Sequence, residues 1–178
     1  GRGALTTGHT IAEAVSGTEW IHPADVDGDG DTDVVVGLYF EESLVWFENR
    51  GRSTNFPRHE MSGNVSDAVA GDVVDLDGDG DVEVAVAGFL SNRVTWFEAP
   101  ANVRSTWSSK LLTPPTPSIL QPADIDGDVK VDLVSATEEG EIHWFQYEGQ
   151  EQFGIAQLAT RWRPGMRVVT TADVDQDN

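Results

Sequence analysis

Carboxylates alternate with glycines in one short segment of the chain, and this pattern could bind a metal ion. Segment 25–33 reads Asp-Val-Asp-Gly-Asp-Gly-Asp-Thr-Asp, so an acid stands at every odd position. Carboxylates this close repel one another unless a cation lies among them, and hard oxygen ligands suit Ca²⁺ better than zinc or copper. Counting from Asp25 as position 1, glycine lets the backbone turn so that the side chains of positions 1, 3, 5 and 9 converge with the backbone carbonyl of position 7. Because Asp and Gly are also poor strand formers, the segment is predicted to be a calcium loop.

The same segment recurs with a period of about 50 residues. We number the positions of each copy from its first Asp and name the copies loop 1 (25–33), loop 2 (75–83), loop 3 (124–132) and loop 4 (173–178). One acidic turn could be an ordinary solvated loop. Copies in register instead indicate a repeated metal site.

The composition limits the class of protein and of partner. The chain has 178 residues, of which 39% are hydrophobic, enough for one sizeable core. Its net charge is -20, but more than half of its 31 acidic residues lie in the four loops. Four calcium ions would bring the charge to about -12, which still argues against nucleic acid or an anionic membrane as a partner.

The absence of cysteine from the sequence excludes a disulfide framework, a thiolate metal site and a cysteine nucleophile. Bound calcium would then take the stabilising role of disulfides. Extracellular modules use calcium sites as weak as roughly 10⁻⁴ to 10⁻³ M. We therefore expect an extracellular location, secreted or at the cell surface, with no membrane insertion.

Two apolar elements follow each complete loop. The first is a short run that fits a strand buried on both faces, and the second contains a repeated Trp-Phe pair. The buried runs are 34–37, 84–88 and 133–136, and the Trp-Phe strands are 45–48, 94–98 and 142–146.

Two further strands complete each period. An inner strand leads into the loop, and its proline, Pro23 or Pro122, predicts an unpaired edge because proline cannot donate to a ladder. An outer strand is marked by apolar residues five apart. The inner strands are 20–24, 68–74, 119–123 and 168–172, and the outer pairs are Thr6 with Ile11, Phe56 with Met61, Trp107 with Leu112, and Phe153 with Leu158.

Four short strands per period of about fifty residues predict an all-β fold, a β-propeller of four-stranded antiparallel blades. No segment has a convincing helical period. Residues 1–178 are expected to be part of one propeller domain. Its predicted parts are blades 18–62, 67–113 and 117–159, a partial blade 166–178, and the outer strand 5–12 of a preceding blade.

These motifs resemble a known family. Segment 24–37, ADVDGDGDTDVVVG, followed by VWFEN at 45–49, is similar to FG-GAP or VCBS-type repeats, the units of integrin α-subunit propellers and of many secreted proteins. The resemblance implies Ca²⁺ bound through positions 1, 3, 5, 7 and 9, position 7 through its carbonyl. The implied ligands are Asp25, Asp27, Asp29, Asp31 and Asp33 in loop 1; Asp75, Asp77, Asp79, Asp81 and Glu83 in loop 2; Asp124, Asp126, Asp128, Lys130 and Asp132 in loop 3; and Asp173, Asp175 and Asp177 in loop 4.

Other calcium loops fit less well. An EF-hand needs Glu at position 12, where this chain has Val36, Val86 and Ser135, and both EF-hand and dockerin-like loops need flanking helices. Family propellers close with about seven blades. The chain begins at Gly1 and stops inside loop 4. We therefore expect a piece of a longer protein, the alternative being that several copies associate to complete a ring.

The histidines offer little chemistry. His9 and His59 occupy equivalent outer-strand places that Lys110 fills in the next copy, so we interpret them as surface positions. His22 precedes Pro23 and could face a central channel. His143 stands before a repeated Trp and is interpreted as structural.

The repeated tryptophans Trp46, Trp96 and Trp144 could stack on sugars, but recurrence in every copy favours packing between blades. No Ser-His-Asp, zinc, phosphate-loop or paired-carboxylate motif stands apart from the loops. The sequence therefore offers no candidate catalytic residues to support an enzyme function.

Three functions remain open from the sequence. The first is a calcium-stabilised extracellular binding or adhesion propeller that contacts protein or glycan through the loops of one face. The second is the propeller portion of a secreted carbohydrate-active enzyme, such as a polysaccharide lyase or sugar dehydratase, and the third is a structural spacer. Loop 3 is predicted to bind calcium more weakly than loops 1 and 2, because Val129 and Lys130 replace Gly and Asp.

Overall fold

Only β-strands form regular structure in the described part of the chain. The computed structural model describes residues 8–13, 15–51, 55–63, 65, 68–88, 91, 93–112, 117–149, 152–162 and 170–172. No helix occurs among these residues. The predicted all-β class is confirmed.

The strands form three antiparallel sheets of four and one short hairpin. The first sheet contains β1 (Thr18–Ala24), β2 (Asp33–Leu38), β3 (Ser43–Phe47) and β4 (Arg58–Ser62). The second contains β5 (Ala68–Val74), β6 (Glu83–Gly88), β7 (Arg93–Glu98) and β8 (Ser108–Leu112). The third contains β9 (Pro117–Ala123), β10 (Asp132–Thr137), β11 (Glu141–Phe145) and β14 (Gln157–Arg161), and the hairpin joins β12 (Tyr147–Gly149) to β13 (Gln152–Phe153).

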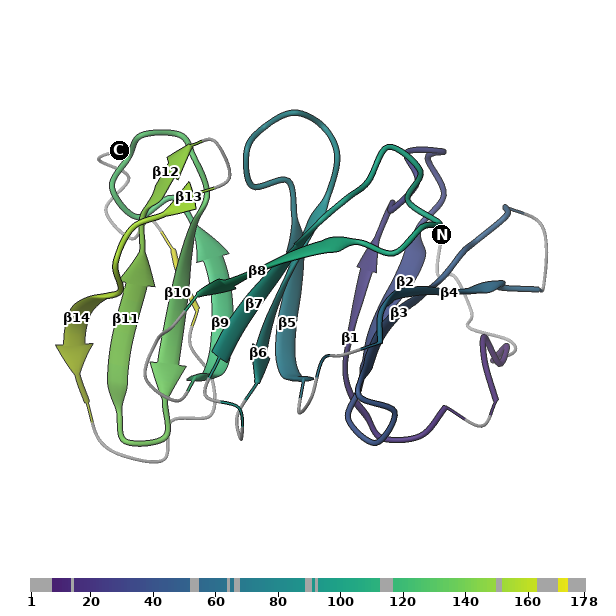
Figure 1. Cartoon of the computed structure of the whole chain (residues 1–178), viewed down its shortest axis with the longest axis horizontal. Coiled ribbons are helices and arrows are strands. Elements are labelled where there is room, and N and C mark those ends of the chain that lie inside the picture. Colours follow the sequence, from purple (N-terminus) through teal and green to yellow (C-terminus); the bar gives the residue numbers. More distant parts are fainter. Residues whose placement is uncertain are drawn as a thin grey trace, which may run out of the picture.

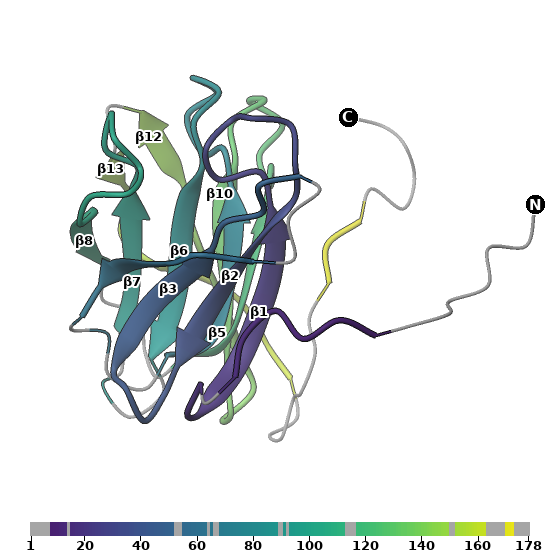
Figure 2. The same ribbon diagram turned by 90° about the vertical axis from the view of Figure 1, so that its right-hand side faces the viewer.

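The three sheets lie side by side in chain order (Figure 1) and one behind another when viewed along the row (Figure 2). Their inner strands β1, β5 and β9 are neighbours. Pro23 and Pro122 lie on inner strands at a sheet edge, as their missing N–H groups require. Each acidic loop joins an inner strand to the next strand of its sheet. Loops 1 to 3 therefore all lie along the same edge of the row, the upper edge in Figure 1.

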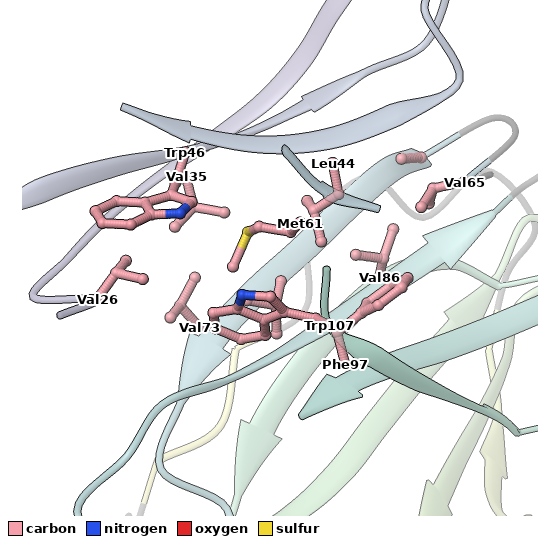
Figure 3. Packing of buried hydrophobic residues seen from close by; sticks show 12 residues of the cluster. Val26, Val35, Leu44, Trp46, Met61, Val65, Val73, Val86, Phe97 and Trp107 are labelled. Atoms are coloured by element: carbon pink, nitrogen blue, oxygen red, sulfur yellow. The ribbon is translucent and has the colours of Figure 1, made fainter. Parts of the chain in front are cut away.

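The core lies between neighbouring sheets. Trp46 is fully buried between the first and second sheets, and Figure 3 shows Met61 between Trp46 and Trp107. Trp96 is equally buried between the second and third sheets, whereas Trp144 is half-buried. The predicted packing role of the repeated tryptophans is therefore confirmed for the first two copies.

A tryptophan also joins the first two inner strands. The indole of Trp20 lies against Gly37 and Gly71, where an added Cβ would meet it at 2.2 and 2.4 Å. Any larger residue would therefore displace the ring. Glycine at these two positions allows the sheets to approach closely.

The structure differs from prediction near both ends of the described chain. Of the outer strand expected over 5–12, residues 8–12 form no strand, and residues 5–7 lie outside the described part. A strand needs a hydrogen-bonded neighbour. Ala12 and Val15 instead pack on the apolar face of the first sheet that points away from the second. Loop 4, with Asp173, Asp175 and Asp177, also lies outside the described residues.

Candidate metal centres

Loops 1 to 3 share one backbone conformation. Positions 4 and 6 have positive φ in each loop, a region that L side chains avoid. Position 4 is Gly28 (71°), Gly78 (78°) or Gly127 (78°), and position 6 is Gly30 (89°), Gly80 (97°) or Val129 (74°). Val129 is a β-branched residue in the conformation that glycine adopts in the other two loops.

The same carboxylate hydrogen bonds close all three loops. Position 1 accepts from the backbone N–H of position 6, at 2.9 Å in loop 1, 3.1 Å in loop 2 and 2.9 Å in loop 3. Position 5 accepts from the N–H of position 7, at 2.8, 2.9 and 3.0 Å. These bonds fix acidic side chains toward the inside of each turn.

Three carboxylates converge in each loop, with ligand atoms within 4.8 Å of one another. Positions 1 and 3 belong to every cluster, joined by position 5 in loop 1 and by position 9 in loops 2 and 3. The clusters are Asp25, Asp27 and Asp29; Asp75, Asp77 and Glu83; and Asp124, Asp126 and Asp132. The remaining implied ligands of these loops, Asp31, Asp33, Asp79, Asp81, Asp128 and Lys130, lie in the same turns but outside these clusters.

Position 9 has a structural role that the sequence analysis missed. Asp33 is fully buried, and its two carboxylate oxygens accept from the backbone N–H groups of Val26 at 2.9 Å and Asn49 at 2.6 Å. Asp132 accepts in the same way from Ile125 at 3.1 Å and Tyr147 at 2.7 Å. In loops 1 and 3, position 9 therefore ties the loop to the segment after the Trp-Phe strand.

Burial makes the position 9 carboxylates hard to ionise. Removal from water raises the pKa of Asp33 and of Asp132, and raises that of Glu83 to about 7. Nearby acids of the same loop add to the increase. A bound cation would favour the charged form and reverse these shifts.

Asp27 provides a direct test of whether a cation fits loop 1. Its side chain is only 5% exposed, and its Oδ1 is buried with no hydrogen-bond partner among the described residues. A buried carboxylate oxygen is costly unless something compensates it. Together with the all-oxygen donor sets, this orphaned atom fits a hard cation such as Ca²⁺.

Loop 3 differs in its charges. The Lys130 ammonium lies 2.8 Å from Asp128 Oδ2, and this contact lowers the pKa of that carboxyl. Asp126 accepts a side-chain hydrogen bond from Gln146. Two of the acids implied as ligands are therefore already paired with polar groups of the same repeat.

Arg104 and Glu48 join loop 1 to the second sheet, and the sequence analysis missed both. The Arg104 guanidinium bonds Asp27 and also Glu48, whose pKa is held below its usual range by hydrogen bonds from Arg50 and Arg104. The only sequence signal was that an acid follows the Trp-Phe pair in the first two copies.

The histidines form contacts of their own. His59 stacks on Trp46 with ring centroids 4.7 Å apart and lies 2.7 Å from a Glu48 oxygen, so the prediction of a plain surface position was wrong. The His59 side chain is only 16% exposed, because one face of its ring is stacked against the indole of Trp46. His22 pairs with Asp72 at 3.1 Å between neighbouring inner strands. His143 is buried, with Glu141 at 3.6 Å.

Repeated four-stranded antiparallel sheets with acidic loops at one edge define a repeat module of the β-propeller type. A sequence profile of the FG-GAP-like repeat matches residues 25–86, 75–135 and 124–178, and the chain belongs to this family. Repeats of this family often bind Ca²⁺ and are typical of extracellular proteins. No curated protein matches the chain significantly. Among the described residues, no helix is long and apolar enough to cross a membrane.

Proposed function

We propose that this chain is a calcium-stabilised extracellular β-propeller module that binds protein or carbohydrate. The observation that carries the calcium part is the convergence of three carboxylates in each of three loops that share the same pattern of positive φ. The orphaned oxygen of Asp27 supports it. Each complete loop would hold one ion, three or four per chain.

The turn opposite the acidic loops supports a binding role. The β2–β3 turn presents Phe40, which is 73% exposed, edge-on to Tyr39 at 5.3 Å. Exposed aromatic rings at loop tips suit contact with sugars or with apolar protein side chains. We place the ligand on this face, and we propose that the rest of the propeller comes from the same longer chain or from another copy.

Calcium binding is tested by titrating the EDTA-stripped chain with CaCl₂ in a calorimeter, with MgCl₂ as the control. We expect binding of three to four calcium ions with dissociation constants no weaker than about 10⁻³ M, and weaker binding of magnesium. Absence of heat up to about 10 mM calcium would contradict the calcium part of the proposal.

Ligand binding is tested on protein and glycan arrays in calcium and in EDTA. We expect retention in calcium, lost in Phe40→Ala and kept in Ile155→Ala, which removes another exposed apolar side chain away from this turn. Retention of nothing, together with turnover of a carbohydrate substrate, would favour an enzyme instead.

A further inference from the structure

Arg104 reaches from the second sheet to loop 1 of the first. It lies in the segment between β7 and β8, which Figure 1 shows extending toward the first sheet. Its Nη2 donates to Asp27 Oδ2, across 77 positions of sequence. A residue of one repeat therefore contacts an implied calcium ligand of the preceding repeat.

The first sheet holds the guanidinium in place. Nη2 donates to Glu48 Oε1 at 2.7 Å, Nε donates to Oε2 at 3.3 Å, and the guanidinium carbon lies 5.9 Å from the centre of the Trp46 ring. Glu48 is 4% exposed. A forked pair on a buried carboxylate and a cation–π contact with an indole fix the position of Arg104.

The second sheet fixes the backbone that carries Arg104. Trp107 is 4% exposed and packs at the interface with the first sheet. Its backbone N–H donates to the Met61 carbonyl at 2.9 Å, and its indole N–H donates to the Val103 carbonyl at 2.9 Å. The placement of Arg104 thus depends on how the second sheet packs on the first (Figure 3).

We propose that Arg104 is the positioning residue through which the second sheet completes the calcium site of loop 1. It holds one oxygen of Asp27 and leaves the buried, unpartnered Oδ1 free for the ion. Calcium binding in loop 1 and the packing of the two sheets then stabilise each other, because coupling between two equilibria is reciprocal. This inference rests on the calcium site proposed above.

A purely electrostatic role of Arg104 would predict the opposite effect of its removal on calcium binding. If Arg104 acted only through its charge, its removal would tighten calcium binding by relieving repulsion. Its side chain is 41% exposed, so water screens that repulsion, and orientation of the ligand decides the outcome. In loop 3 the corresponding Asp126 is held by Gln146 of its own repeat, so loop 3 does not depend on a neighbouring sheet in this way.

The test reads each loop separately in the full chain. In a calcium titration followed by amide NMR, Gly28 and Gly30 report loop 1, while Gly78 and Gly80 report loop 2. In Arg104→Gln we expect the loop 1 dissociation constant to weaken at least tenfold, the usual effect of losing a residue that orients a metal ligand. The loop 2 constant should stay within twofold, and Arg93→Gln, an exposed arginine of β7, should change neither loop.

Arg104→Lys separates orientation from charge. Lysine keeps the positive charge but cannot fork between Asp27 and Glu48, so we again expect weaker binding at loop 1. An unchanged or tighter loop 1 constant in Arg104→Gln would overturn the inference. Failure of every loop to respond in the unaltered chain would overturn the calcium proposal, and this inference with it.

A measurement on the unaltered chain covers the case in which the Arg104 variants do not fold. Calcium should slow hydrogen exchange at the Trp107 amide, which bonds across the interface to Met61, more than at the amides of β14, the outer strand of the third sheet. Equal slowing at both places would contradict the coupling.

Discussion

A single residue explains why the three loops should not be equal. Val129 has φ of 74° where loops 1 and 2 have glycine, and a non-glycine residue in this region costs roughly 1–2 kcal/mol. The structure has a positive φ at position 6 in all three loops, so valine is strained where glycine is not. The affinity that follows from it is still a prediction.

We expect the double variant Val129→Gly, Lys130→Asp to tighten calcium binding at loop 3. It relieves the strain, restores an acid and removes the ammonium that pairs with Asp128. The gain should be about tenfold in affinity, read from the Gly127 amide in a calcium titration. Filling of loop 3 before loops 1 and 2 in the unaltered chain, at limiting calcium, would contradict the reasoning.

Glu83 should make stability depend on pH in EDTA. Its pKa is raised to about 7 from the usual 4.5, so the folded protein holds this proton more tightly than the unfolded chain. The contribution of Glu83 to stability is therefore greatest below about pH 4.5 and is lost as pH rises toward about 7. In calcium the direction reverses, because the ion needs the charged carboxylate.

Glu83→Gln is the variant that checks this pH dependence. The amide oxygen can still accept from the Leu76 N–H, but the group no longer titrates. In EDTA near pH 8 we expect the variant to be more stable than the unaltered chain by on the order of 2 kcal/mol, with little difference near pH 4. Urea unfolding of the variant and of the unaltered chain at each pH measures these differences. Identical unfolding curves of the two proteins near pH 8 would refute the raised pKa of Glu83.

At the scale of strands, periodicity predicted most of the fold. The inner, buried, Trp-Phe and outer strands occur in the expected order in each described sheet. The β12–β13 hairpin was missed because it has no counterpart among the described residues of the other two repeats. It is held by Tyr147 packing edge-on to Phe153 at 5.2 Å, a contact without any periodic signal.

The site was predictable only as far as it repeats. Acids at fixed spacing located the loops, since spacing is a local property of the chain. The partnership of Arg104 with Asp27 could not be predicted, because it joins residues 77 apart and depends on how two sheets pack. The anchoring role of Asp33 was likewise hidden, because its partner Asn49 belongs to another strand connection.

Interfaces between sheets should dominate the stability of these elements. Trp46→Ala removes a fully buried ring from the interface of the first two sheets and should cost about 3–5 kcal/mol. Trp144→Ala alters the matching position of the third sheet, where the ring is half-buried, and should cost less. Urea midpoints compare the two variants, and a larger loss in Trp144→Ala would contradict this view of the core.

At the scale of the whole molecule, repulsion among the acidic residues works against the compact fold. A net charge of -20 repels itself in a compact fold, and 14 of the 31 acidic residues lie in loops 1 to 3, along one edge of the row of sheets. The aligned loops therefore concentrate the repulsion in one place. Cations bound there would relieve it for all the sheets together.

Calcium should accordingly raise the melting temperature of the whole chain. At tenfold excess over its dissociation constant, each site adds about 1.4 kcal/mol, so the three described loops would together add about 4 kcal/mol. Asp27→Ala should lose the calcium stabilisation contributed by loop 1. Asp31→Ala should lose less of it, because this position is implied to bind through its backbone carbonyl. Thermal unfolding in calcium and in EDTA measures these differences, and a melting temperature that EDTA leaves unchanged would show that the loops do not hold calcium.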